Sequence, residues 1–202
     1  MFLQIDPDNP LKKDIKRASW VLSEGGVIAY PTDTIYGIGC DLFNKDAIER
    51  IYRIKRLPKY KQLSFICRDI KQVSEFAQVS NMAYKIIKSL APGPFTFILN
   101  STRNVPKIMM NKRREVGIRI VSNPICSSLL EELENPLINT SATVEEGEYM
   151  SDPYEIYEKF GNELDMVIDG GISFSDPSTV IDLTASEPVI VRQGRGDASK
   201  VL

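Results

Sequence analysis

Apolar and polar positions change period repeatedly along the chain, and each change marks a new element. Short apolar runs bounded by turn residues predict strands, the first of them buried. They occupy 27–30, 63–67, 95–99, 116–120, 136–143, 166–169, 177–183 and 188–194. Apolar residues spaced three and four apart predict helices over 12–23, from 44 or 46 to 55, after 69, and over 81–90, 105–110, 123–133 and 152–160. The alternation predicts an α/β fold in one domain spanning 1–202.

The stretch 27–41 contains the densest polar motif. Pro31 ends an apolar strand because proline cannot donate to a sheet, and Thr32 and Thr34 then flank Asp33. Gly37 and Gly39 lack side chains, so backbone amides there could approach a bound group. The motif therefore predicts the floor of a ligand site, with a plain polar turn as the alternative.

The second helix ends its apolar face on a lysine. Ile48, Ile51 and Tyr52 form the inward stripe, and Lys55 lies one step further at the same spacing. Its side chain either extends past the edge to water or points into a cavity. Spacing alone favours the path to water.

Basic residues are bunched although the chain is nearly neutral. One cluster crosses the end of the second helix, at Arg53, Lys55, Arg56, Lys59 and Lys61, and another is Lys112, Arg113 and Arg114. Such clusters are either solvated faces or sites for phosphate and carboxylate groups. An arginine inside a strand, as at position 119, must find an anion or lie at an edge.

Hydroxyl groups follow or begin several strands. They are Thr32 and Thr34, Thr140 and Ser141, and Ser178 and Thr179. Together with Lys55, Arg56, Arg119 and Arg192, they predict one polar cavity over a sheet, suited to an anionic ligand. The same groups suit adenylation, because cations and a metal ion can stabilise charge on a phosphoryl group without a histidine base.

Composition excludes several other classes. The chain has no histidine, which excludes Ser/His/Asp hydrolysis, Cys/His nucleophiles and the usual zinc enzymes. Its 3 cysteines show no paired spacing, so neither a disulfide framework nor a zinc site is indicated. A net charge of −2 gives no indication of a nucleic-acid-binding protein. Without a leader or an apolar run long enough to span a bilayer, we expect a soluble cytoplasmic protein that binds no membrane.

Four motifs together resemble the YrdC family over nearly the whole chain. They are Tyr30 to Asp41, Pro92 to Thr96, Ser178 to Asp182, and Arg192-Gln193-Gly194. The resemblance implies a twisted mixed sheet of about seven strands, covered by helices, with one large polar cavity. It also implies synthesis of threonylcarbamoyl-adenylate from L-threonine, bicarbonate and ATP with Mg²⁺, with no protein-bound metal. The product serves threonylcarbamoylation of tRNA adenosine 37, usually through a separate transferase.

The resemblance also assigns roles to residues. Threonine contacts are implied at Thr32, Thr34, Arg119, Thr140 and Ser178. Nucleotide contacts are implied at Lys55, Arg56, Ser141 and Arg192, and the catalytic group at Lys55, Ser141 and Thr143. Double-stranded RNA binding is attributed to the family as well. The exposed cations that suit it are Arg53, Lys59, Lys61, Lys112, Arg113 and Arg114.

The chain departs from the family pattern in its catalytic motifs. Leu57 stands where Lys-x-Arg expects arginine, Thr143 stands where Ser-x-Asn expects asparagine, and Gln62 replaces a proline. These changes resemble the YciO branch, as do 5–10 and 122–124. Losing one preorganised donor lowers a rate by about 100- to 1000-fold. We therefore expect weak or altered activity.

Three hypotheses follow. The first is a threonylcarbamoyl-adenylate synthase of reduced or shifted activity. The second is a non-catalytic protein that binds duplex RNA or tRNA through the two basic clusters. The third is an enzyme acting on another carbamoyl or acyl adenylate.

Overall fold

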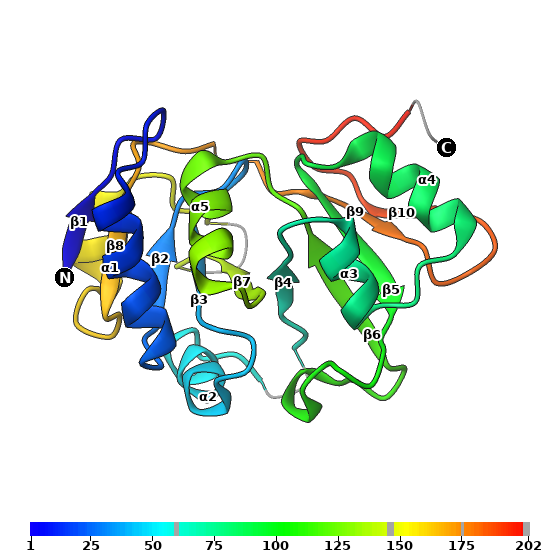
Figure 1. Ribbon diagram of the computed structural model, residues 1–202, viewed down its shortest axis with the longest axis horizontal. Helices are drawn as coiled ribbons and strands as arrows, with labels where there is room; N and C mark the ends of the chain where they lie inside the picture. The colour runs from blue at the N-terminus through cyan, green and yellow to red at the C-terminus, as the bar shows by residue number, and fades with distance from the viewer. Residues whose placement is uncertain (59–60, 145–147, 175, 200–202) are drawn as a thin grey trace.

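The computed structural model describes residues 1–58, 61–144, 148–174 and 176–199, and within them a single sheet crosses the molecule (Figure 1). Ten strands follow the order β1-β8-β2-β3-β7-β4-β6-β5-β9-β10. The strands are β1 Phe2–Gln4, β2 Ile28–Tyr30, β3 Gly37–Gly39, β4 Ser64–Ile66, β5 Phe95–Asn100, β6 Glu115–Arg119, β7 Leu137–Ser141, β8 Met166–Asp169, β9 Thr179–Asp182 and β10 Val189–Arg192. Parallel and antiparallel pairs are mixed, so the predicted mixed α/β fold is confirmed with more strands than about seven.

Six α-helices and one short 3-10 helix complete the described part of the chain. They are α1 Lys12–Ser23, α2 Lys45–Ile54, α3 Ile70–Phe76, α4 Asn81–Leu90, η1 Lys107–Met109, α5 Pro124–Leu133 and α6 Pro153–Phe160. Asn44, rather than Asp46, caps α2, because its side chain accepts a hydrogen bond from the Ala47 amide. No helix among the described residues has the length and apolar character needed to cross a bilayer.

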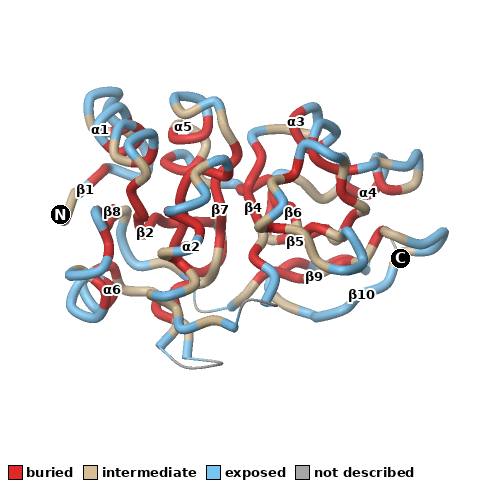
Figure 2. The backbone as a smooth tube through the Cα atoms, turned by 90° about the horizontal axis from the view of Figure 1, so that it is seen from below, coloured by how far each residue is buried: buried red, intermediate tan, exposed pale blue. Residues whose placement is uncertain are grey.

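Helices cover the sheet through two apolar clusters. The first cluster lies under α1 and α5 and includes Ile28, Ile66 and Leu137. The larger second cluster packs α2, α3, α4 and α6 against strand residues such as Ile38 and Ile138. Figure 2 shows α1 and α5 on one side of β2 and β7, with α6 on the other side. Adjacent strand residues point to opposite faces, so Leu137 and Ile138 belong to different clusters.

The sequence did not predict two of the ten strands, β1 and β3. β1 has three residues and is defined by its parallel pairing with β8. β3 contains Gly37 and Gly39, whose low strand propensity hides it. Its register with β2 and β7 explains both glycines: a side chain at 37 would collide with Asn139 and Tyr30, and one at 39 with the Ile138 carbonyl. The glycines therefore admit neighbouring strand atoms, so they do not provide the predicted open approach for a ligand.

Candidate functional site

A row of polar side chains crosses one face of the sheet. The register places Tyr30 opposite Gly37, and Asn139 opposite Ser64. The Tyr30 hydroxyl donates to the side-chain oxygen Oδ1 of Asn139 at 2.9 Å, and the Ser64 hydroxyl donates to the main-chain carbonyl of Asn139 at 3.0 Å. Because these partners lie on separate strands, the row continues across the sheet rather than along one strand. Tyr30 is fully buried, and its burial raises the pKa of its hydroxyl far above the ordinary value.

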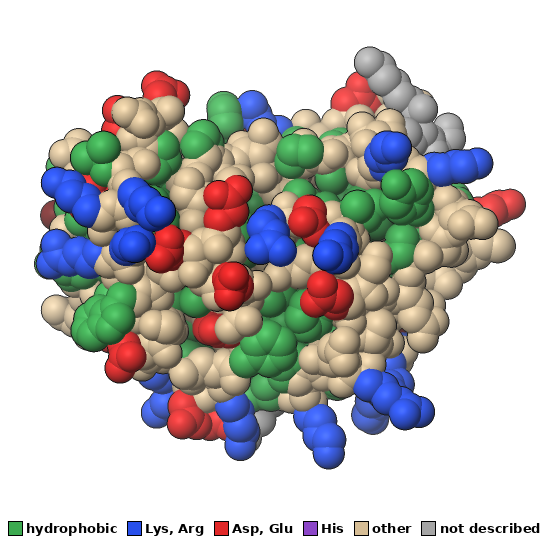
Figure 3. Space-filling view, viewed as in Figure 1, with side chains coloured by type: hydrophobic (Ala, Val, Ile, Leu, Met, Phe, Trp, Pro, Cys, Tyr) green, Lys and Arg blue, Asp and Glu red, His purple; other side chains and the backbone are tan. Residues whose placement is uncertain are grey.

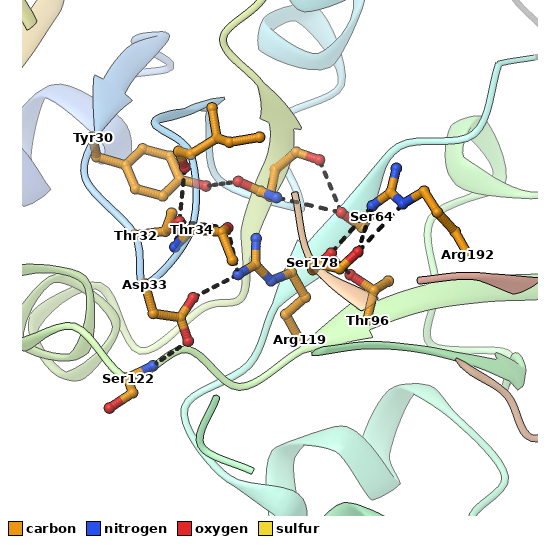
Figure 4. Close-up of polar contacts among 12 residues, drawn as sticks. Tyr30, Thr32, Asp33, Thr34, Ser64, Thr96, Arg119, Ser122, Ser178 and Arg192 are labelled. Carbon is orange, nitrogen blue, oxygen red and sulfur yellow. Dashed lines mark hydrogen bonds and ion pairs between the residues drawn. The ribbon is translucent and has the colours of Figure 1, made fainter. Parts of the chain in front are cut away.

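Arg119 lies near the centre of this row (Figure 4). Its Nη2 contacts Asp33 Oδ1 at 2.6 Å and Thr34 Oγ1 at 3.0 Å. Asp33 Oδ2 accepts from the Ser122 amide at 2.9 Å, and Thr32 Oγ1 lies 3.1 Å from Thr34 Oγ1. The strand arginine has therefore found the anion that the sequence required, and it ties the 31–36 loop to β6.

One buried nitrogen of Arg119 has no hydrogen-bond partner among the described residues. The residue is only 4% exposed, and Nε is the one buried side-chain nitrogen or oxygen with no hydrogen bond among the described residues. A buried donor left unpaired destabilises a folded protein by about 1–3 kcal/mol. This group therefore has the chemistry to donate to a carboxylate or hydroxyl oxygen of a ligand.

Arg192 and Ser178 form the other end of the row. Arg192 donates to the Ser178 carbonyl through Nη2 at 2.8 Å, while the Ser178 hydroxyl lies 2.8 Å from Thr96 Oγ1. Figure 4 shows Arg119 between this group and Thr32, Asp33 and Thr34. Ser178 is buried, whereas Arg192 belongs to the exposed strand β10. Its guanidinium is thus anchored by a main-chain oxygen yet remains accessible to solvent.

Lys55 lies in a different environment. Its Nζ donates to the Thr143 carbonyl at 2.6 Å and to Thr143 Oγ1 at 2.8 Å, and lies 5.4 Å from the centre of the Phe160 ring. Desolvation lowers the pKa of the ammonium from 10.5 to about 8. The path to water that spacing favoured is wrong: the head group turns inward and contacts Thr143, which the family motif placed in the catalytic group with Lys55.

Thr140 and Ser141 do not share a face of the sheet. Thr140 pairs with Ile38 and, by strand alternation, points to the same side as Ile138. Ser141 pairs with Gly37 and therefore points to the side of Asn139 and Ser64. Since α2 packs on the Ile38 side, Lys55 approaches the end of β7 from the face opposite Ser141. The prediction that one cavity holds Lys55, Arg119 and Arg192 together stays a prediction.

The two basic clusters meet at a groove. Lys61, Lys112 and Arg113 line one hollow of about 390 Å³ together with Tyr52. Arg53 and Arg114 are exposed, and Lys59 falls outside the described residues. Arg56 is exposed too, with φ +48°, because α2 ends at Ile54 and the chain turns there. Leu57, in place of the family's arginine, packs against the larger core cluster.

A second hollow opens beside Arg119's partners. It measures about 810 Å³ and is lined by Thr32, Asp33, Ser122, Phe174 and Arg195, among other residues. The guanidinium of Arg195 lies 3.4 Å from the centre of the Phe174 ring. Thr32, a predicted site residue, and Asp33, which lies in the same motif, therefore line a cavity large enough for a small ligand.

Sequence reasoning left several residues of the site without a role. They are Tyr30, Asp33, Ser64, Thr96, Ser122 and Asn139. Asp33 carried a usable signal, because Arg119 needed an anion and Asp33 lay inside the motif. Asn139 carried a weaker one, as a polar residue inside an apolar strand. The contacts of Ser64 and Thr96 depend on strand order, which spacing does not give.

Comparison with known proteins places the site in context. The Sua5/YciO/YrdC family model, described as "Telomere recombination", matches residues 20–194. YciO of Escherichia coli (strain K12) is 42% identical over 100% of this chain and 98% of its own length. The crystal structure of E. coli YciO has a TM-score of 0.95 and is covered to 99%.

Two further relatives carry names that describe chemistry. A putative threonylcarbamoyl-AMP synthase of Methanocaldococcus jannaschii is 33% identical over 91% of this chain and 86% of its own length. A crystal structure of P. abyssi Sua5 complexed with L-threonine is 28% identical, with a TM-score of 0.90. It covers 96% of this chain, which spans 57% of that protein.

Proposed function

The chain belongs to the Sua5/YciO/YrdC family, and on that premise we propose that it is a slow threonylcarbamoyl-AMP synthase. The proposed reaction joins L-threonine, bicarbonate and ATP with Mg²⁺, and releases pyrophosphate. The product would pass to a separate transferase in the cytoplasm for modification of tRNA adenosine 37. Relatives named for this activity, and a Sua5 structure complexed with L-threonine, support the proposal.

The unpaired Nε of Arg119 is the observation that carries the substrate assignment. Asp33 and Thr34 fix the guanidinium through Nη2, so Nε is presented in one orientation. A threonine carboxylate beside it would gain a charge-assisted hydrogen bond that the empty protein lacks. Thr32 lines the adjoining hollow and supplies a hydroxyl close to the same guanidinium.

Two cations suit the nucleotide. Arg192 is exposed and anchored on Ser178, so it can bind a phosphate oxygen without first being ordered. Among the described residues, Lys55 contacts two neutral oxygen acceptors and a ring, and its pKa is lowered to about 8 by desolvation. An anionic phosphate or carbamate at Lys55 would relieve that penalty, which makes negative charge the preferred occupant there.

The altered motif accounts for a slow rate. Leu57, partly buried, packs against the larger core cluster where the family's arginine would offer two donors. Thr143 accepts from Lys55 through both oxygens, whereas an asparagine amide could also donate to a ligand. Each missing donor raises the barrier by about 2.7–4 kcal/mol, so we expect turnover at least about 100-fold below that of an intact motif.

The test is threonine-dependent and bicarbonate-dependent release of pyrophosphate from Mg-ATP, combined with calorimetric titration of L-threonine. Thr34→Val keeps the shape of a buried side chain but removes the hydroxyl that Arg119 contacts. Threonine affinity should fall about tenfold, because the guanidinium that is proposed to bind the carboxylate loses a contact that fixes its orientation. Thr102→Val, in the turn after β5, is the matched control and should bind normally. Absence of threonine binding by the folded wild-type chain would reject the proposal.

The groove where the two basic clusters meet favours a second function, binding of duplex RNA. Lys61, Lys112 and Arg113 come from distant segments yet line one hollow. Phosphate contacts of this kind give an affinity that falls steeply with salt. Duplex RNA binding that weakens on Lys112→Gln/Arg113→Gln, without any pyrophosphate release, would favour this function over the first.

A further inference from the structure

Helix α1 carries the one exposed aromatic ring that has no aromatic or cationic neighbour within the described residues. The exposed aromatic side chains are Trp20, Phe43, Tyr84, Tyr154, Tyr157 and Phe174. Phe2, Phe76, Lys88 and Arg195 pack against the other five rings. Trp20 is 63% exposed without such a partner. The indole therefore offers both a large apolar area and free π-faces to solvent.

Cations precede this ring at helical spacing, and Ser23 and Glu24 follow it. Lys13, Lys16, Arg17 and Trp20 recur three and four residues apart, opposite the buried face of α1, and we call them the α1 stripe. All four are exposed, and Figure 3 shows Lys and Arg side chains gathered over α1 at the left edge of the molecule. Across the described ranges, none of the three cations forms a salt bridge. The stripe thus carries three positive charges that form no ion pair with the described residues.

The chemistry of the stripe selects an anionic partner with flat aromatic groups. Seven residues of helix separate Lys13 from Trp20, a rise of about 10.5 Å, which two or three successive phosphates of an extended strand can span. A base can stack on the exposed indole without needing a groove. A membrane surface would gain little, because the stripe has a single apolar side chain to insert. An acidic helix would need an apolar hollow around Trp20, whereas its helical neighbours Lys16, Arg17, Ser23 and Glu24 are all polar or charged.

We propose that the α1 stripe is a binding platform for single-stranded nucleic acid, with phosphates on Lys13, Lys16 and Arg17 and one base stacked on Trp20. This surface is separate from the polar row of the sheet and from the groove of Lys61, Lys112 and Arg113. It goes beyond the proposed adenylate chemistry, since α1 shares no contact with Arg119, Lys55 or Arg192 among the hydrogen bonds and ion pairs of the described residues.

Trp20 is the single tryptophan of the chain, so tryptophan fluorescence reports directly on binding at the stripe. The full-length protein is titrated with the 12-residue oligonucleotides rU12 and dT12 while tryptophan emission is recorded. Stacking should quench the emission saturably, and the affinity should fall with salt. The same titration is repeated with vesicles containing anionic phospholipid and with polyglutamate.

Two variants locate the contact. Lys13→Gln/Lys16→Gln/Arg17→Gln should abolish most quenching and lower the salt slope by about 2, the value for three lost contacts to single strands. The matched control, Lys71→Gln/Lys85→Gln/Arg103→Gln, removes the same charge from exposed positions on α3, α4 and the turn after β5, and should behave as wild type. Trp20→Ala, followed by the anisotropy of labelled rU12, should weaken binding about fivefold or more.

Several results would overturn the proposal. Quenching that survives in the α1 triple variant, or that falls equally in the control variant, would place the oligonucleotide elsewhere. A blue shift with anionic vesicles and no response to rU12 or dT12 would assign the stripe to a membrane surface. Competition by polyglutamate at the affinity of the oligonucleotide would show that charge alone is recognised, without stacking.

Discussion

Arg119 and Lys55 are both withdrawn from water, but the chain compensates their charges in different ways. Arg119 contacts Asp33 at 2.6 Å and is 4% exposed. Lys55 has two oxygens of Thr143 and the Phe160 ring, all of them neutral. Among the described residues, one cation is therefore paired with a carboxylate, and the other contacts neutral groups.

The difference separates two tasks. A buried arginine with a carboxylate partner holds its position whether or not a ligand is bound, so it can orient a substrate. A lysine with a lowered pKa gains stability when an anion arrives, so its region responds to the charge of the ligand. Changes near Arg119 should therefore affect folding, whereas changes near Lys55 should affect pH dependence.

The largest effect is expected from Asp33→Ala, which leaves the buried guanidinium without its carboxylate. Breaking a buried pair on one side destabilises a protein by about 3–5 kcal/mol. Urea denaturation at pH 7 measures the free energy of unfolding. In the double variant Asp33→Ala/Arg119→Met, neither charge remains and most of the loss should be recovered. A loss below about 1 kcal/mol for the single variant would show that the pair does not hold the loop.

Lys55→Met should change how stability depends on pH. The folded-state pKa of Lys55, about 8, lies below the ordinary 10.5, so at pH 7 the buried ammonium destabilises the fold. As pH rises from 8 to 10.5, the unfolded chain still binds the proton and the folded chain does not, so wild-type stability rises relative to the variant. With solvent screening of this half-buried group, we expect a rise of about 1–2 kcal/mol.

Urea denaturation of wild type and Lys55→Met at pH values between 7 and 10 tests this. Subtracting the free energy of unfolding of the variant from that of wild type removes the contribution of the buried thiols and tyrosines, which titrate in both proteins. A difference that stays constant across this range would mean that the ammonium is not desolvated. Adding Mg-ATP should narrow the difference below pH 8 if a phosphate reaches Lys55.

A smaller effect is expected from Thr143→Val, which removes one acceptor from Lys55 and leaves the carbonyl. The free energy of unfolding at pH 7 should fall by about 0.5–1.5 kcal/mol, and the pKa of Lys55 should fall further. Competitive labelling of amines against pH measures that pKa. Thr140→Val is the control, because the Thr140 side chain makes no hydrogen bond with the described residues. Equal effects of the two variants would contradict the specific contact.

Periodicity was enough to predict most of the fold. Eight of the ten strands and the α-helices follow from apolar runs and stripes, and packing buries most of these, although β10 stays exposed. β1 and β3 were not predicted, because β1 is defined by its pairing with the distant β8 and the two glycines of β3 hide its strand character. Gly37 and Gly39 also misled, because the space they leave is filled by β2 and β7.

The site could be predicted where a buried charge requires an oppositely charged partner. An arginine in an apolar strand implied an anion, and the Asp33 motif contained one. The side of the sheet was harder to predict, because alternation separates Thr140 from Ser141 only once the strand is known to extend through both. The direction of the Lys55 side chain was predicted wrongly, because helical spacing applies only while the helix continues. Helix α2 ends one residue before Lys55, and the contact with Thr143 then determines where the ammonium lies.

Arg192→Gln should have the smallest effect on stability and completes the comparison with a third kind of cation, one that is accessible to solvent. The side chain leaves an exposed strand and donates to the buried Ser178 carbonyl at 2.8 Å, so a glutamine amide can replace part of that contact. The free energy of unfolding should therefore change by no more than about 0.5 kcal/mol. Affinity for Mg-ATP should nevertheless fall about tenfold, because a charge-assisted contact to phosphate is lost. Calorimetric titration measures the affinity, and Arg103→Gln, an exposed arginine in the turn after β5, should bind as wild type. Equal nucleotide affinity in both variants would remove Arg192 from the site and leave Arg119 as the arginine of the row that faces a ligand.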